Sequence, residues 1–149
     1  MKKVISLCIL FIALIFAGCQ NEENSANTIG EQNNVPDYTP SSEDVVDMHG
    51  EIENKERFEE FLNNVEKNQK DSIRVVSYTT EGDPMLKDLE YDGGVIKYTT
   101  DTRRDKFGVG SISNTSCTSV EVVETTERTD YLLEGCDNKV DNIILVTWK

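Results

Sequence analysis

From Asp71 onward the chain is a succession of short segments rich in β-branched and aromatic residues, which is typical of β-strands. Turn signals separate these segments. Asp92-Gly93 predicts a type I′ hairpin turn, which needs positive φ at both central residues, and Pro84 ends the preceding strand because it has no amide donor. The predicted strands are residues 73–79, 85–91, 95–100, 108–113, 118–125, 131–136 and 143–148.

Residues 55–70 carry a helical pattern, because four apolar side chains recur at positions i, i+3, i+4 and i+7. These four side chains are Phe58, Phe61, Leu62 and Val65. Asn54 is the predicted N-cap, Glu56 favours the positive end of the helix dipole, and Lys67 and Lys70 favour the negative end. The segment is therefore predicted to form an amphipathic helix.

Together these patterns predict the fold class of residues 44–149. We expect a single α+β domain in which one N-terminal amphipathic helix packs on a curved antiparallel β-meander sheet of five to seven short strands. The hydrophobic content of 37% supports one modest core.

Residues 1–18 have the features of a signal peptide. Lys2 and Lys3 precede an apolar run, residues 4–16, that is shorter than the ~20 residues needed to span a bilayer. Ala17 and Gly18 are the small residues that a signal peptidase requires before its cleavage site. We therefore expect this segment to be removed during export.

The box Phe16-Ala17-Gly18-Cys19 resembles the lipobox of bacterial lipoprotein signal peptides. The resemblance implies that diacylglycerol is attached to Cys19, which then becomes the new N-terminus and holds the chain on the extracytoplasmic face of the cell membrane. The alternative is an ordinary secretory peptide with Cys19 near the cut by chance.

Residues 19–43 are expected to form the lipidated cysteine and a flexible tether. The stretch is rich in Asn, Glu, Ser and Thr and buries too little apolar surface to offset its ordering entropy. The alternative is that part of it packs on the domain through Ile29, Val35 or Tyr38.

The chain is strongly acidic, with a net charge of −13. Removing residues 1–18 takes away two lysines and no acid, so the mature charge is −15. Such a surface repels nucleic-acid phosphates and anionic headgroups. We therefore predict that the chain binds no nucleic acid and that its folded part does not adhere to membranes by itself.

Cys117 and Cys136 are predicted to form a structural disulfide. If the chain reverses at Thr126-Glu127, the two cysteines face each other across an antiparallel hairpin, and an exported domain lies in oxidising surroundings. The alternative is a redox or metal-binding pair, but the chain has no Cys-x-x-Cys motif.

His49 is the only histidine in the chain, so any Ser-His-Asp or Cys-His site would have to use it. No Gly-x-Ser-x-Gly motif occurs, and a zinc site would lack imidazole ligands. We therefore predict that the chain is not an enzyme and carries no cofactor.

Two groups of charged residues are candidates for contact with other molecules. Arg103, Arg104 and Lys106 are a basic cluster that suits an anion or an acidic partner. The acids are mainly expected to be solvated, but they would converge at one end of the sheet as a weak Ca²⁺ site if the turns brought them together. These acids are Glu81, Asp83, Asp88, Glu90 and Asp92.

Three stretches resemble a family of small Gram-positive lipoproteins that carry a domain of unknown function. They are HGEIENKERFEEFL, IRVVSYTTEGDPMLKDLEYDGGVIKYTTDTRRDKFG and the Leu-Glu-Gly-Cys that ends at Cys136. The resemblance covers about residues 45–148 and implies export, lipid anchoring and a single α+β domain. The family has no established activity, so it implies no catalytic residues.

Two hypotheses of function follow. The first is a membrane-anchored, non-enzymatic module that binds a protein of the cell envelope through the turn region of Glu81, Asp83 and Asp92 together with the basic cluster. The second is a small-ligand or divalent-cation binding domain that uses the acidic turns.

Overall fold

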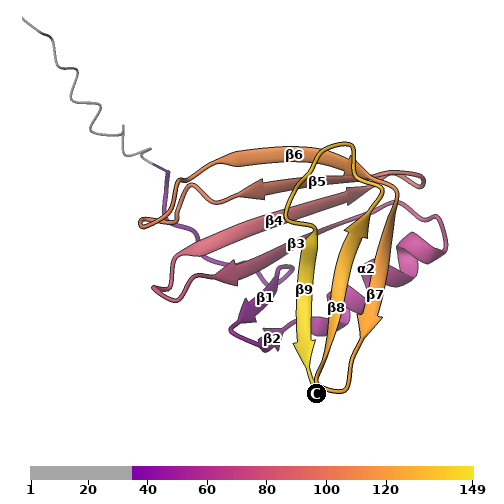
Figure 1. The fold of residues 1–149 in the computed structure, drawn as a ribbon, viewed down its shortest axis with the longest axis horizontal. Helices are drawn as coiled ribbons and strands as arrows, with labels where there is room; N and C mark the ends of the chain where they lie inside the picture. Colours follow the sequence, from indigo (N-terminus) through magenta and orange to yellow (C-terminus); the bar gives the residue numbers. More distant parts are fainter. Residues whose placement is uncertain (1–34) are drawn as a thin grey trace, which may run out of the picture. The chain divides into compact units, whose positions relative to one another are not determined.

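The computed structural model describes residues 35–149, and this part of the chain is mainly β. It contains a six-stranded sheet, a three-stranded sheet and, among the described residues, one helix (Figure 1). The predicted α+β fold with one meander sheet of five to seven strands is therefore wrong. The predicted signal peptide and Cys19 lie outside the described residues.

The larger sheet has the strand order β2-β1-β3-β4-β5-β6. All neighbouring strands are antiparallel except β1 and β3, which run parallel. Because β1 pairs with only Val75 to Ser77, the first half of β3 has no strand neighbour on that side. The strands are β1 (Val45–Met48), β2 (Glu51–Glu53), β3 (Asp71–Tyr78), β4 (Pro84–Tyr91), β5 (Ile96–Asp101) and β6 (Ile112–Cys117).

The smaller sheet is an antiparallel meander in the order β7-β8-β9. The register of the pairing between β8 and β9 shifts between Tyr131 and Leu132. In Figure 1 its strands run across those of the larger sheet, and α2 lies on the same side of the larger sheet. The strands are β7 (Ser119–Glu124), β8 (Arg128–Glu134) and β9 (Ile143–Trp148).

The helix α2 (Lys55–Glu66) forms where the apolar periodicity predicts one. Phe58 and Phe61 are buried, and the Phe58 ring meets Tyr131 of β8 edge to face with ring centres 4.9 Å apart. Asn54, however, has a left-handed backbone with φ of 57° and makes no side-chain cap. Its side-chain amide donates instead to the carbonyls of Ser42 and Asp44, because the chain before the helix folds back beside it.

The main core lies between the inner face of the larger sheet, α2 and the smaller sheet. Its largest members are fully buried aromatic and aliphatic side chains, such as Tyr98, Phe61, Leu89 and Leu133. Burial of such side chains contributes roughly 1.5–3 kcal/mol each to stability. A smaller cluster of Val46, Val76 and Leu86 lies on the opposite, outer face, where Tyr38 packs against it.

The Cys117–Cys136 disulfide is present, as predicted. The hairpin reverses at Thr126-Glu127, and β7 and β8 pair in the predicted register, with Ser119 opposite Glu134. The pairing extends beyond the start of β7 and the end of β8, because the Asp137 amide donates to the Ser116 carbonyl. The disulfide therefore closes the corner at which the chain passes from the larger sheet to the smaller one.

Candidate functional site

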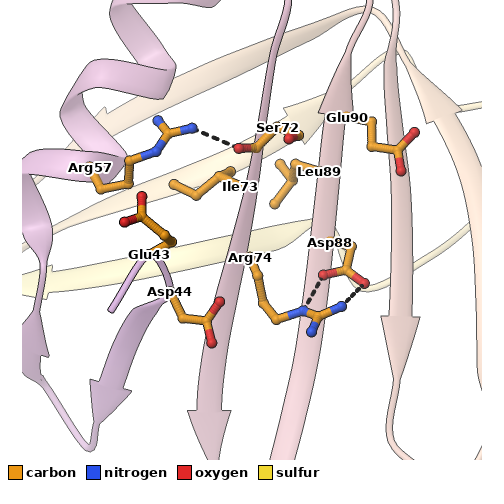
Figure 2. A pocket seen from close by; sticks show the side chains of 9 residues that line it. All are labelled: Glu43, Asp44, Arg57, Ser72, Ile73, Arg74, Asp88, Leu89 and Glu90. Carbon is orange, nitrogen blue, oxygen red and sulfur yellow. Dashed lines mark hydrogen bonds and ion pairs between the residues drawn. The ribbon is translucent and has the colours of Figure 1, made fainter. Parts of the chain in front are cut away.

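A polar hollow of about 430 Å³ lies on the outer face of β3 and β4 (Figure 2). Strand alternation places Ser72 and Arg74 of β3 and Asp88 and Glu90 of β4 on this face, opposite the core. We call it the outer hollow. Its lining residues are Glu43, Asp44, Arg57, Ser72, Ile73, Arg74, Asp88, Leu89 and Glu90.

One wall of the outer hollow is built by Arg57 of α2. Its guanidinium holds the Asp71 carboxylate with N–O distances of 3.0 and 2.6 Å and also donates to the Ser72 carbonyl at 2.6 Å. Burial alone would raise the pKa of Asp71, but hydrogen bonds from Arg57 and Asn64 outweigh it and lower that pKa. Arg57 thus ties α2 to the first half of β3, which has no strand neighbour on its β1 side.

The floor of the outer hollow carries a cross-strand ion pair. Arg74 faces Asp88 in the register of β3 and β4 and donates to it at 2.5 and 2.8 Å. Figure 2 shows this two-pronged contact. Hydrogen bonds from Arg74 to Asp88 raise the pKa of Arg74, so the guanidinium stays charged. Both side chains are about one-third exposed and can still meet a ligand.

Tyr38 lies beside the outer hollow, in contact with two of its lining residues, Arg74 and Asp44. Two guanidinium groups lie over its ring, that of Arg74 at 5.5 Å and that of Arg104 at 5.6 Å from the ring centre. Its hydroxyl donates to the Asp44 carboxylate, which also accepts the Ser41 amide. The segment before β1 is therefore held on the outer face by cation–π and hydrogen-bond contacts.

A second hollow of about 320 Å³ adjoins the first, since Glu90 lines both. It extends over β5 and β6 to Asp137 and Asn138. The two hollows lie on two rows of polar side chains that face one another across four strands, which we call the outer polar face. Its residues are Ser72, Arg74, Asp88, Glu90, Lys97, Thr99, Asn114 and Ser116, all exposed or half-buried.

The predicted basic cluster lies in the β5–β6 loop, and its charges are paired within the chain. Arg103 and Arg104 both bind the Asp101 carboxylate, at 2.9 and 3.1 Å. Hydrogen bonds from Arg103 lower the pKa of Asp101. Arg104 also donates to the Pro36 carbonyl at 3.0 Å. These arginines therefore hold the loop and the Tyr38 segment in place.

Lys106 and Asp83 are brought together, as the proposed contact surface requires. The buried Asp83 carboxylate accepts the Lys106 amide at 2.9 Å and lies 3.0 Å from its ammonium group. The hydrogen bond from the Lys106 amide lowers the pKa of Asp83. Glu81 is exposed in the turn between β3 and β4.

Asp92 lies in the turn between β4 and β5, at the other end of these strands from Asp83, so the acidic turns do not converge. Only Gly93 has positive φ in this turn, so the predicted type I′ geometry is also wrong. The Asp92 carboxylate accepts the Gly94 and Val95 amides instead, and the hydrogen bond from Val95 lowers its pKa. Its role in the structure is to close the turn.

Sequence reasoning missed the outer hollow because its parts are brought together by pairing. Arg74 and Asp88 are ordinary charged residues until the register of β3 and β4 sets them face to face.

Within residues 35–149 no group of three His, Cys, Asp or Glu side chains could hold a metal ion. No described helix is long and apolar enough to span a bilayer.

Comparison with known proteins gives a family but no relative of known activity. A family model described as a domain of unknown function (DUF4362) matches residues 42–132, from just before β1 into β8. No curated protein and no solved structure matches the chain. Since the family model spans more than half of its length, the chain belongs to the DUF4362 family.

Proposed function

We propose that the chain is a lipoprotein of a Gram-positive cell, anchored through diacylglycerol on Cys19, whose extracytoplasmic domain is a non-enzymatic module that binds an envelope protein. The lipobox-like segment that ends at Cys19 supports the anchor and the location. An anchor of two acyl chains gives durable attachment, whereas one chain gives only marginal attachment.

The outer polar face is the observation that carries the binding proposal. It offers carboxylate, guanidinium, ammonium, hydroxyl and amide groups on adjacent strands, in two shallow hollows. Such a surface can exchange hydrogen bonds and ion pairs with a polar protein surface over a wide area. The Arg74–Asp88 pair is preorganised by the strand register, so little ordering is lost on binding.

No observation favours the cation-binding alternative. Asp83 and Asp92 accept hydrogen bonds from the chain itself, and they lie at opposite ends of the sheet. The partner is therefore better sought among proteins than among divalent ions.

Site-specific photo-crosslinking in intact cells tests the proposal. A photo-reactive amino acid replaces Lys97 on the outer polar face or, as a control, Glu121 on β7; both side chains are exposed strand positions. We expect one envelope protein to crosslink at position 97 and not at position 121. The crosslink should be lost with the unanchored Cys19→Ala chain, which should also lose incorporation of labelled palmitate.

The recovered partner is then titrated in purified form. Lys97→Glu should weaken its binding at least several-fold, because it reverses a charge at the centre of the surface, while Glu121→Lys should leave the affinity unchanged. Equal crosslinking at both positions, or none at either, would contradict the assignment of the surface. Palmitate labelling that survives Cys19→Ala would contradict the anchor.

A further inference from the structure

The β5–β6 loop presents two large apolar side chains to solvent. Phe107 is 78% exposed and Val109 is 96% exposed, the two highest values among the large hydrophobic side chains that are exposed in residues 35–149. Single exposed apolar residues are common, but two at one loop tip form a small apolar projection. We call Phe107 and Val109 the apolar tip.

Hydrogen bonds within the β5–β6 loop support the backbone at Phe107 and at the base of the loop. The Asp105 carboxylate accepts the amides of Phe107 and Gly108 at 3.0 and 2.8 Å. At the base of the loop the Thr102 amide donates to the Ser111 carbonyl at 2.9 Å. Because these contacts order the loop, exposure of the apolar tip is a property of the folded state.

The apolar tip lies at the end of the domain where the N-terminal segment enters. Arg104, in the same loop, donates to the Pro36 carbonyl, so the described chain begins beside the β5–β6 loop (Figure 1). The tether was predicted over residues 19–43, but its part from Pro36 to Tyr38 contacts the domain, and a coil of about 15 residues before this part would reach roughly 20 Å. An acylated Cys19 would therefore keep this end of the domain close to the bilayer.

Charge also distinguishes this end of the domain. Residues 107–111 of the loop are uncharged, and the acids beside the apolar tip, Asp105 and Asp83, are held by hydrogen bonds within the chain. The Lys106 side chain is 76% exposed, and its ammonium group lies 3.0 Å from the buried Asp83 carboxylate. The loop therefore offers an anionic bilayer two apolar side chains beside a lysine that is paired with Asp83, so its local charge is close to neutral in a chain whose net charge is −13.

We propose that Phe107 and Val109 insert into the interface of the membrane that holds Cys19, with Lys106 at the level of the headgroups. This inference rests on the proposed lipid anchor. The anchor raises the local concentration of lipid at the apolar tip, so a contact too weak to bind a free domain becomes populated. The outer polar face would then be held at a defined orientation to the membrane.

Tryptophan quenching in vesicles tests the insertion. The full lipidated chain is reconstituted in phosphatidylcholine–phosphatidylglycerol vesicles whose acyl chains carry bromine. Phe107→Trp places a probe at the apolar tip, and Val122→Trp places a matched exposed probe on β7, which lies away from the β5–β6 loop (Figure 1). Trp148, the only native tryptophan, gives the same background in both.

We expect the probe at position 107 to be quenched several-fold more than the probe at position 122, with its emission shifted to the blue. Equal quenching at both positions in a chain that floats with the vesicles would overturn the insertion and leave the anchor intact. A full chain that does not float would overturn the anchor, and the insertion with it. Quenching at position 107 in a Cys19→Ala chain would overturn the dependence on the anchor.

Discussion

Asp71 of β3 links the larger sheet to α2 through side-chain hydrogen bonds. Its carboxylate accepts hydrogen bonds from Arg57 and Asn64 of α2. The Asp71 and Arg57 side chains are only 15% and 17% exposed, so the pair is screened less than a surface salt bridge.

Asp71→Asn should lower the free energy of unfolding at pH 7 by about 1–3 kcal/mol, because the charge-assisted bonds to Arg57 are lost. The pKa of Asp71 is lower in the folded state than its ordinary value of 3.8. Its contribution to stability is therefore fully present above pH 3.8 and is lost as the pH falls through the folded-state pKa. Urea unfolding of both proteins between pH 7 and strongly acidic pH checks this.

The exposed Glu121→Gln serves as the control, since no ion pair involves Glu121 among the described residues. The difference in free energy of unfolding between the parent and the Asp71→Asn variant should become smaller as the pH falls. A difference that stayed constant down to the lowest pH would show that Asp71 contributes by packing and not by its charge.

Several individual residues were predictable only as chemical types. The sequence identifies Asp92 as a turn residue. It does not show that the Asp92 carboxylate accepts amides of the turn, because this contact needs a loop longer than a type I′ turn. The cations of the β5–β6 loop were identified as a basic cluster. Their partners, Asp101 and Asp83, could not be found without the fold.

At the scale of the elements, the corner between β6 and β7 joins the two sheets. Thr118 alone separates these strands, and its amide donates to the Glu134 carbonyl. Gly135 faces this corner with φ of 64°, and a Cβ there would lie 2.2 Å from Thr118 Oγ1. The disulfide closes the same corner, with Cys117 fully buried.

Replacing both cysteines, Cys117→Ala with Cys136→Ala, should lower the free energy of unfolding by roughly 3 kcal/mol, because the unfolded chain regains the entropy of the open loop. Urea unfolding of the double variant measures this. The parent should lose a similar amount on reduction, while the double variant should not respond to the reductant. Equal stability of the parent and the double variant would contradict a stabilising role.

Elements with local signals were predicted well, and elements that depend on distant partners were not. β9 forms over residues 143–148, as its β-branched run indicates, and α2 follows its apolar periodicity. β1 and β2 are short, and β1 is defined by its parallel pairing with the distant β3. β6 begins at Ile112 and not at residue 108 as predicted, because residues 108–111 belong to the β5–β6 loop.

At the scale of the whole molecule, the prediction of one meander sheet failed at the corner. Every strand after β3 is antiparallel to the next one within its sheet, so the local order does resemble a single meander. The break between β6 and β7 leaves no strong sequence signal, because the chain turns there within a single residue. The outer polar face could not be predicted for the same reason, because its extent depends on which strands belong to the larger sheet, and that sheet ends at β6.

The net charge of −13 acts on the molecule as a whole and sets the last prediction. Mutual repulsion of the acids is greater in the folded state than in the expanded unfolded chain. Raising the salt concentration from ~10 mM to ~150 mM shortens the screening length from ~30 Å to ~8 Å, which relieves this repulsion. Urea unfolding at the two salt concentrations should therefore show a higher free energy of unfolding at the higher salt concentration.

The salt effect should be smaller in a variant with two exposed acids of the smaller sheet neutralised, Glu121→Gln with Glu134→Gln. The half-buried pair of Arg57 and Asp71 opposes the trend only weakly, because such pairs are screened less. Stability that fell with salt in the parent would mean that its ion pairs outweigh its net charge. In that case the acidic surface would not limit stability, and neutralising these acids would bring no gain at low salt.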